Sequence, residues 1–183
     1  MVINIKTYGG YNLKELKSLG HGYQGTVYKI DSTKCIKVFK KREDFIDELT
    51  TLIMCEKNPY FTKLYSFGEK YIVREYVEGI SLDKYLKENL LSQFICQNIL
   101  NIYFAMKSVG FKRLDSALFH IYITKSNTFK VIDTARAMKK EYTYPFLIID
   151  GLNKLGYKNQ FLDYLKKNNL ELYKKWEDKI WDF

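Results

Sequence analysis

The chain has 183 residues, the length of one compact domain, so we do not expect a second independent domain. Hydrophobic residues make up 46% and charged residues 28%, which excludes a disordered chain and supplies a core without disulfides or a structural metal. The formal net charge is +9, but the lysines are spread along the sequence, so we expect a solvated surface and no nucleic-acid-binding face.

The first part of the chain is predicted to form an antiparallel β-sheet with one helix. Five β-rich runs, separated by Gly-rich and polar turns, are expected to be strands: 11–19, 25–30, 34–39, 64–67 and 71–75. Apolar residues at three- and four-residue steps over 43–57 predict an amphipathic helix that ends before Pro59. The sheet therefore has one helix to cover it.

The pattern becomes mainly helical after Gly79. Helices are expected at 82–88, with Ser81 as N-cap, and at 91–109, closed by Gly110. The segments 117–124 and 128–133 are then predicted to pair as strands, and two or three helices follow from Phe146. We expect one two-lobed domain over 1–183, with an N-lobe at about 1–78, a C-lobe at about 79–183 and a ligand cleft between them.

Cys35, Cys55 and Cys96 stand apart from one another and from any His cluster, so we expect reduced thiols in the core. The amino terminus lacks a basic stretch followed by an apolar run and a cleavage site, which predicts no signal peptide. No apolar stretch approaches the roughly 20 residues that span a bilayer. A cytoplasmic protein without a membrane partner is expected.

A glycine-rich motif joins the first two long strands, because Gly20, Gly22, Gly25 and Val27 fit the pattern GxGxxGxV. The same pattern occurs in dinucleotide-binding folds, where it opens a helix. Here it leads into a β-rich run that ends at Ile30. In such a hairpin, backbone amides cover a triphosphate and the glycines permit close approach, so this context favours the kinase type of loop.

Lys37 lies on the next strand, beside the glycine hairpin, where it can neutralise the α- and β-phosphates of a nucleotide if a carboxylate holds it in place. Glu43, Glu48 and Glu56 are all candidates for that carboxylate. Glu48 is preferred, because it lies mid-helix on a turn adjacent to the residues that should face the sheet, such as Leu52.

The segment 71–82 looks like a kinase hinge and the helix after it, and together with the preceding motifs it resembles the protein-kinase superfamily. The resemblance implies that the backbones of Glu75 and Val77 hold the adenine of ATP. Arg74 then occupies the gatekeeper position, where an arginine can narrow the pocket or reach a phosphate or carboxylate.

The catalytic loop of that family is matched in part. Asp115, in the run Arg113-Leu114-Asp115, stands where the family has His-Arg-Asp, which implies that it accepts the proton of an attacking hydroxyl. Five residues later His120 replaces the family's metal-binding Asn. Imidazole suits Mn²⁺ better than Mg²⁺, so the second metal site is altered.

The run Val131-Ile132-Asp133-Thr134-Ala135 resembles the strand and Asp-Phe-Gly motif of the family. It implies that Asp133 binds the Mg²⁺ (or Mn²⁺) that bridges the phosphates. Because Thr134 replaces the Phe, the usual apolar spine cannot form in its familiar way, and we do not expect switching by rotation of this motif.

The motifs occur in the family's order from about residue 13 to 136, which predicts an α+β, protein-kinase-like fold. No Ala-Pro-Glu motif follows and little room remains for an activation loop, so the chain resembles compact RIO-type and small bacterial kinases. Trp176 and Trp181 are expected to pack helices.

Two functions stay open, beside a basic nucleic-acid-binding module that no cluster of aromatic residues interleaved with Arg supports. The first is an ATP-dependent kinase that phosphorylates a Ser or Thr of a protein, or a small molecule, with Lys37, Glu48, Asp115 and Asp133 as the working groups. The second is a pseudokinase that binds nucleotide or a partner protein without turnover, which the replaced motif residues favour.

Overall fold

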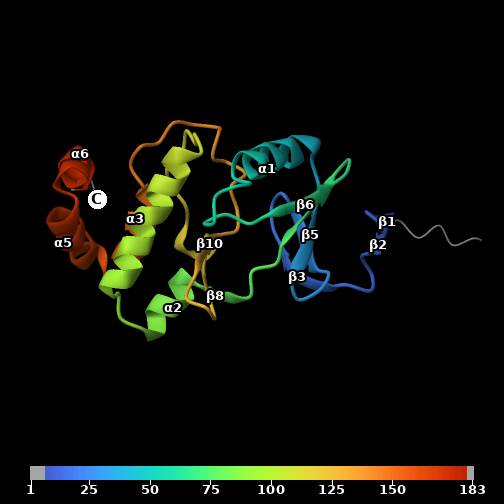
Figure 1. Cartoon of the computed structure of the whole chain (residues 1–183), viewed down its shortest axis with the longest axis horizontal. Helices are drawn as coiled ribbons and strands as arrows, with labels where there is room; N and C mark the ends of the chain where they lie inside the picture. The colour runs from blue at the N-terminus through green and yellow to red at the C-terminus, as the bar shows by residue number, and fades with distance from the viewer. Residues whose placement is uncertain (1–6, 181–183) are drawn as a thin grey trace, which may run out of the picture.

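A five-stranded antiparallel sheet forms one end of the protein in the computed structural model, which describes residues 7–180 (Figure 1). The strand order is β3-β4-β5-β7-β6. Its members are β3 (Lys17–His21), β4 (Gly25–Lys29), β5 (Lys34–Phe39), β6 (Leu64–Phe67) and β7 (Tyr71–Glu75). One helix, α1 (Arg42–Met54), lies against this sheet.

A small core joins α1 to the sheet. Phe39 on β5 and Ile72 on β7 pack against two residues of the helix, Phe45 and Leu52, and all four are buried. Phe39 and Phe45 meet edge to face with ring centroids 5.8 Å apart, a favourable geometry for aromatic pairs. These contacts fix α1 against the face of the sheet that also carries Lys37.

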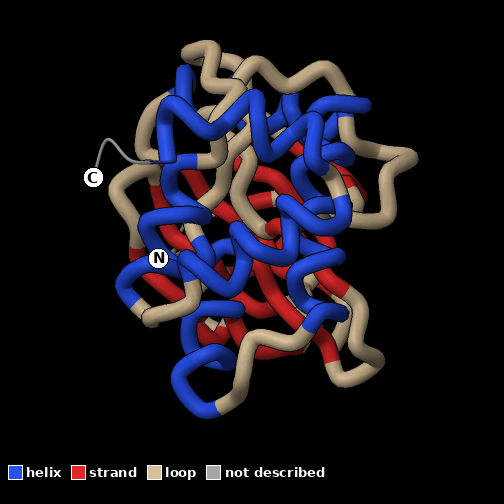
Figure 2. The backbone as a smooth tube through the Cα atoms, turned by 90° about the vertical axis from the view of Figure 1, so that its left-hand side faces the viewer, coloured by secondary structure: helices blue, strands red, loops and turns tan. Residues whose placement is uncertain are grey.

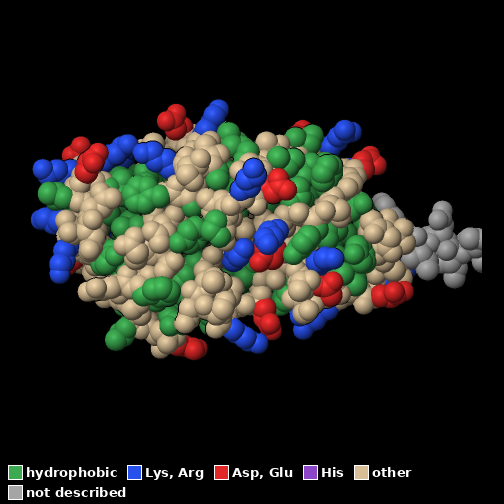
Figure 3. All heavy atoms as spheres, in the orientation of Figure 1, with side chains coloured by type: hydrophobic (Ala, Val, Ile, Leu, Met, Phe, Trp, Pro, Cys, Tyr) green, Lys and Arg blue, Asp and Glu red, His purple; other side chains and the backbone are tan. Residues whose placement is uncertain are grey.

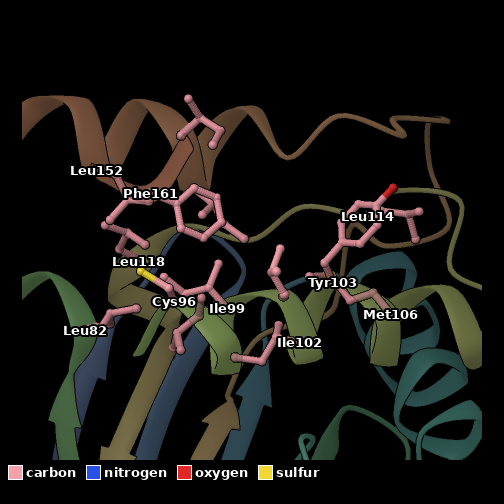
Figure 4. Packing of buried hydrophobic residues seen from close by; sticks show 14 of the residues in the cluster. Leu82, Cys96, Ile99, Ile102, Tyr103, Met106, Leu114, Leu118, Leu152 and Phe161 are labelled. Carbon is pink, nitrogen blue, oxygen red and sulfur yellow. The ribbon is translucent and has the colours of Figure 1, made fainter. Parts of the chain in front are cut away.

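The helical part of the chain surrounds a second, larger core. Its helices are α2 (Leu82–Glu88), α3 (Gln93–Ser108), α4 (Phe146–Lys154), α5 (Lys158–Asn168) and α6 (Leu170–Ile180). Cys96, Ile99 and Ile102 of α3 are buried, and Figure 4 shows them near Leu118 and Phe161. Seen from this end in Figure 2, helices lie in front of the strands.

A three-stranded antiparallel sheet lies beside these helices, in the order β10-β9-β8. It contains β8 (Gly79–Ser81), β9 (Ile121–Thr124) and β10 (Phe129–Val131). Gly79 is required here, because a Cβ on it would lie 2.3 Å from the carbonyl oxygen of Ile123. The chain therefore crosses from one sheet to the other at a point where the backbones approach closely.

The predicted fold class is confirmed, and most element bounds agree to within a few residues. The bounds of β5, β6, β7 and α2 are as expected. All three cysteines are free and buried, as predicted. Trp176 packs in the helical core, whereas Trp181 lies outside the described residues.

Two strand predictions were wrong in part. The expected strand 11–19 begins only at Lys17, because residues 11–12 form β2 (Tyr11–Asn12) in a separate hairpin with β1 (Thr7–Tyr8). Gly9 and Gly10 make that turn with φ of 60° and 85°, a backbone that favours glycine. The expected strand 117–124 begins only at Ile121, since Leu118–His120 forms a 3₁₀ turn, η1.

Within residues 7–180, no helix is long and apolar enough to cross a membrane. On the face drawn in Figure 3, Lys and Arg side chains are interspersed with Asp and Glu.

Candidate active site

A cavity of ≈ 820 Å³ lies between the five-stranded sheet and the helical part of the chain. This volume is in the range of small-molecule binding sites. The predicted site residues that line it are Gly20, Gly22, Gly25, Val27, Lys37, Glu75, Val77, Asp115, His120 and Asp133. Glu48 does not line the cavity and contacts Lys37 from α1. The structure thus brings together groups that are up to 113 positions apart in the sequence, from Gly20 to Asp133.

The glycine motif forms the hairpin between β3 and β4, as the β-rich continuation predicts. The Gly22 amide donates to the Gly25 carbonyl at 2.8 Å and closes the turn. A Cβ on Gly25 would lie 2.1 Å from the Val38 carbonyl oxygen, so packing requires that glycine. A Cβ on Gly20 would meet nothing within 4 Å, so the absence of a side chain there leaves open space beside the cavity.

Lys37 and Glu48 form a buried ion pair between β5 and α1, in which the Lys37 ammonium donates to the carboxylate. Glu48 is 1% exposed, whereas its competitors Glu43 and Glu56 are exposed. Burial raises the pKa of Glu48 above its ordinary value, an effect that Lys37 and Arg74 partly offset. The carboxylate predicted to position the lysine is therefore the one that the structure places beside it.

Arg74 is a second buried cation at the same carboxylate. Its Nε lies 3.8 Å from Oε1 of Glu48, and the side chain is 7% exposed. Burial alone would lower the pKa of Arg74, but nearby acidic groups, among them Glu48 and Asp133, outweigh it and raise that pKa. Glu48 thus lies between two cations. An arginine at position 74 was expected to narrow the pocket or to reach a phosphate or carboxylate, and the carboxylate beside it is that of Glu48.

Asp133 and His120 line the same cavity as Lys37. Asp133 Oδ2 is 3.9 Å from Nε2 of His120. The Asp133 side chain is 29% exposed and the His120 side chain is 31% exposed. Burial alone would raise the pKa of Asp133, but Lys37, His120 and the amide of Ala135 hold it below the ordinary value. Burial lowers the pKa of His120, so its imidazole is neutral near pH 7.

An ionised carboxylate facing a cavity is an oxygen ligand of the kind that Mg²⁺ prefers, and a neutral imidazole suits Mn²⁺ better. Within residues 7–180, no group of three or more His, Cys, Asp and Glu side chains is placed to hold a metal ion without help from a ligand. Asp133 and His120 therefore fit a metal that takes its remaining ligands from phosphate and water, as Mg²⁺ usually does with nucleotides.

Asp115 is held by the first turn of α4. The Leu147 amide lies 3.0 Å from each carboxylate oxygen, and the Ile148 amide lies 3.3 Å from Oδ1. Arg113 Nη2 is 3.4 Å from Oδ2, and the Asp115 side chain is 2% exposed. Burial raises its pKa, and these donors oppose the shift. The group predicted to accept a proton thus has both oxygens engaged by the protein.

The segment predicted to be the hinge comprises the end of β7 and the link from β7 to β8. The Glu75 carbonyl accepts from Sγ of Cys35 at 3.6 Å, and the Glu75 carboxylate pairs with Lys130 at 3.0 Å. Among residues 7–180, Val77 has no hydrogen bond from its backbone amide or carbonyl, and it lines the cavity. Both groups of Val77 are available to a ligand.

Cys35 and Arg136 are among the lining residues that were not predicted to belong to the site. Cys35 alternates with Lys37 on β5 and so faces the same side, a signal that strand alternation offers. Arg136 follows Asp133 in an irregular segment, where no pattern indicates which way a side chain points.

These features define a protein-kinase-like fold: an antiparallel sheet with a glycine hairpin, a Lys–Glu pair between sheet and helix, and a helical second part. Among solved structures, the chain is similar to the PknI kinase domain of Mycobacterium tuberculosis, solved as a single mutant and as a double mutant. For the single mutant the TM-score is 0.53 at 17% identity, covering 78% of this chain and 66% of the other.

The double mutant gives the same TM-score and identity, with 74% of this chain and 64% of the other covered. The chain thus spans just under two thirds of the length of these kinase domains. No protein-family profile and no curated protein sequence matches it. The likeness is one of fold.

Proposed function

We propose that this protein is an ATP-dependent phosphotransferase that transfers phosphate to a Ser or Thr of a protein or to a small molecule. One observation carries the proposal: Lys37, held by Glu48, and Asp133 face the same ≈ 820 Å³ cavity beneath the glycine hairpin. A fixed cation and an ionised acid at one triphosphate-sized site are the groups that phosphoryl transfer needs most.

Lys37 neutralises the α- and β-phosphates, and Glu48 holds it there. Val77 offers its backbone amide and carbonyl to the base, and Glu75 lines the adjoining wall. Asp133, with His120, would hold Mg²⁺ or Mn²⁺, which supplies charge neutralisation on the phosphates when bound.

Asp115, which contacts the first turn of α4, would orient the acceptor hydroxyl. Its carboxylate can take a proton from a substrate only if the first turn of α4 releases one of its oxygens, because the Leu147 and Ile148 amides and Arg113 now engage both. Local opening of a short helix end is a low-energy motion in many proteins.

That same contact favours the second candidate, a pseudokinase that binds nucleotide or a partner protein without turnover. An acid used as the cap of a helix has a structural role that persists without catalysis. In this case the cavity still binds nucleotide, and Asp115 keeps α4 in place.

Two measurements separate these candidates. Thermal shift with ATP, Mg²⁺ and Mn²⁺ tests binding, because a ligand that binds only the folded form raises its stability. Release of labelled phosphate from ATP tests turnover, with Asp133→Asn as the variant and Asp150→Asn, on the exposed face of α4, as the matched control. Binding without turnover would leave the pseudokinase, and the absence of a shift by ATP with either metal would overturn ATP as the nucleotide of this site.

The proposed compartment is the cytoplasm, because three free, buried thiols suit a reducing environment. We propose no membrane or nucleic-acid partner.

A further inference from the structure

Arg74 lines the cavity at a position where its guanidinium can form hydrogen bonds to the base of a nucleotide. On β7 it lies directly opposite Cys35 of β5, one strand step from the hinge residue Glu75. It lines the cavity although it is only 6% exposed. A buried arginine in a ligand cavity needs acceptors, because its guanidinium has five N–H donors and accepts nothing.

The protein supplies few of those acceptors. Glu48 is the ion-pair partner of Arg74, at 3.8 Å from Nε, which is too long for a hydrogen bond. Nε of Arg74 is buried without a hydrogen-bond partner, and so is Oε1 of Glu48. A buried donor without an acceptor is costly, so the guanidinium favours a ligand that brings acceptors to this end of the cavity.

Part of the cavity wall is apolar. Leu19, Val27 and Cys35 line it from the sheet, and Val77 lines it from the hinge. Apolar walls with a few polar groups at the edge suit a flat ring system such as a purine. Val77 offers both a free donor and a free acceptor, which either purine can use.

The purines differ in the groups that they would present to an arginine. Guanine has two adjacent acceptors, O6 and N7, which an arginine can bind with two parallel hydrogen bonds. Adenine has N7 but carries an amino group at C6, which is a donor and would face the donors of the guanidinium. The C6 position is therefore where Arg74 distinguishes the two bases.

We propose that Arg74 is a specificity-determining residue that makes the site prefer a purine nucleotide with a carbonyl group at C6, such as GTP, over ATP. The inference rests on the proposed nucleotide site and narrows it: the roles of Lys37 and Asp133 toward the phosphates are the same for either base.

The test is a set of dissociation constants for ATP, GTP and ITP with Mg²⁺, measured by calorimetry on the full chain. ITP is the decisive probe, because its base has the carbonyl at C6 and N7 but lacks the amino group of guanine. We expect GTP and ITP to bind about tenfold more tightly than ATP. This factor lies toward the lower end of the discrimination between bases that an arginine with two parallel hydrogen bonds to guanine provides. 7-Deaza-GTP, which lacks the N7 acceptor, should bind less tightly than GTP.

Arg74→Met keeps the length of the side chain and removes its donors, so the preference for ITP over ATP should disappear. Arg74→Lys keeps the charge but loses the two parallel donors, and it should retain only part of the preference. The three nucleotides are compared on the wild-type chain first, so the result does not depend on whether a variant folds.

Nucleotide binding in which ATP equals or exceeds ITP on the wild-type chain would overturn this inference and leave the proposed function intact. The same would follow if Arg74→Met bound nucleotide with the wild-type ratio. Failure of all three nucleotides to bind would instead remove the proposed function, and this inference with it.

Discussion

Thr51 of α1 and Thr134, the residue after Asp133, are joined by a hydrogen bond of 2.7 Å between their buried hydroxyl groups. Thr51 already donates its only hydroxyl proton to the Glu48 carbonyl at 2.9 Å. Thr134 must therefore be the donor to Thr51. A polar bond thus connects the helix of the Lys37–Glu48 pair to the segment of Asp133, at the position where the resemblance to kinases implies an apolar side chain.

This bond predicts a measurable coupling. Thr134→Val leaves the Thr51 oxygen without its donor, and we expect unfolding in urea to show a loss of about 1 kcal/mol. The double variant Thr51→Val/Thr134→Val should lose less than the sum of the two single changes. Thr50→Val is the control, because Thr50 makes a similar bond within α1 but is exposed, and it should change stability by less than about 0.5 kcal/mol. Strict additivity would contradict the coupling.

Because Glu48 is the ion-pair partner of both Lys37 and Arg74, we expect its substitution to cost more stability than the substitution of Lys37. Glu48→Gln leaves Lys37 and Arg74 without their common anion, and we expect a loss of about 3–5 kcal/mol in the free energy of unfolding. Lys37→Met should cost less, because Arg74 remains beside Glu48. Glu56→Gln, an exposed change just after α1, should stay within about 0.5 kcal/mol. If Lys37→Met proved as costly as Glu48→Gln, Arg74 would not be a second partner.

The contacts of Asp115 predict that it stabilises α4. Asp115→Asn replaces one accepting oxygen by a donor that faces backbone amides, so we expect a loss of about 1–2 kcal/mol, as for a lost helix cap. Hydrogen exchange of the Leu147 and Ile148 amides should accelerate at the same time. Asp150→Asn on the same helix removes only an exposed pair with Lys154 and should cost a few tenths of a kcal/mol. Equal losses in the two variants would rule out the capping role.

The buried thiols predict slow alkylation of the native protein. Burial raises the pKa of Cys55 to about 12 and that of Cys96 to about 11, so neither forms a reactive thiolate near neutral pH. Iodoacetamide at pH 8 should label neither residue in the folded chain and both in urea, read by mass spectrometry. Because these folded pKa values lie above the ordinary value of 9.0, the contribution of each thiol to stability is complete below pH 9.0 and is lost as the pH rises toward 11 or 12. Rapid labelling under native conditions would contradict this burial.

The sequence by itself determined the strand-rich and helical parts, the glycine hairpin and the choice of Glu48 over Glu43 and Glu56. These features follow from local patterns, since alternation specifies a strand and three- and four-residue steps specify the face of a helix. The boundary errors came from short-range details, such as the Gly9-Gly10 turn, that compete with the longer pattern.

Only the tertiary structure decided how the polar groups of the site are paired. Arg74 meets Glu48 from 26 positions away, Asp115 meets Leu147 from 32 and Thr51 meets Thr134 from 83. No local periodicity encodes such pairs, because each arises where separately formed elements pack and buried polar groups must find partners in one another.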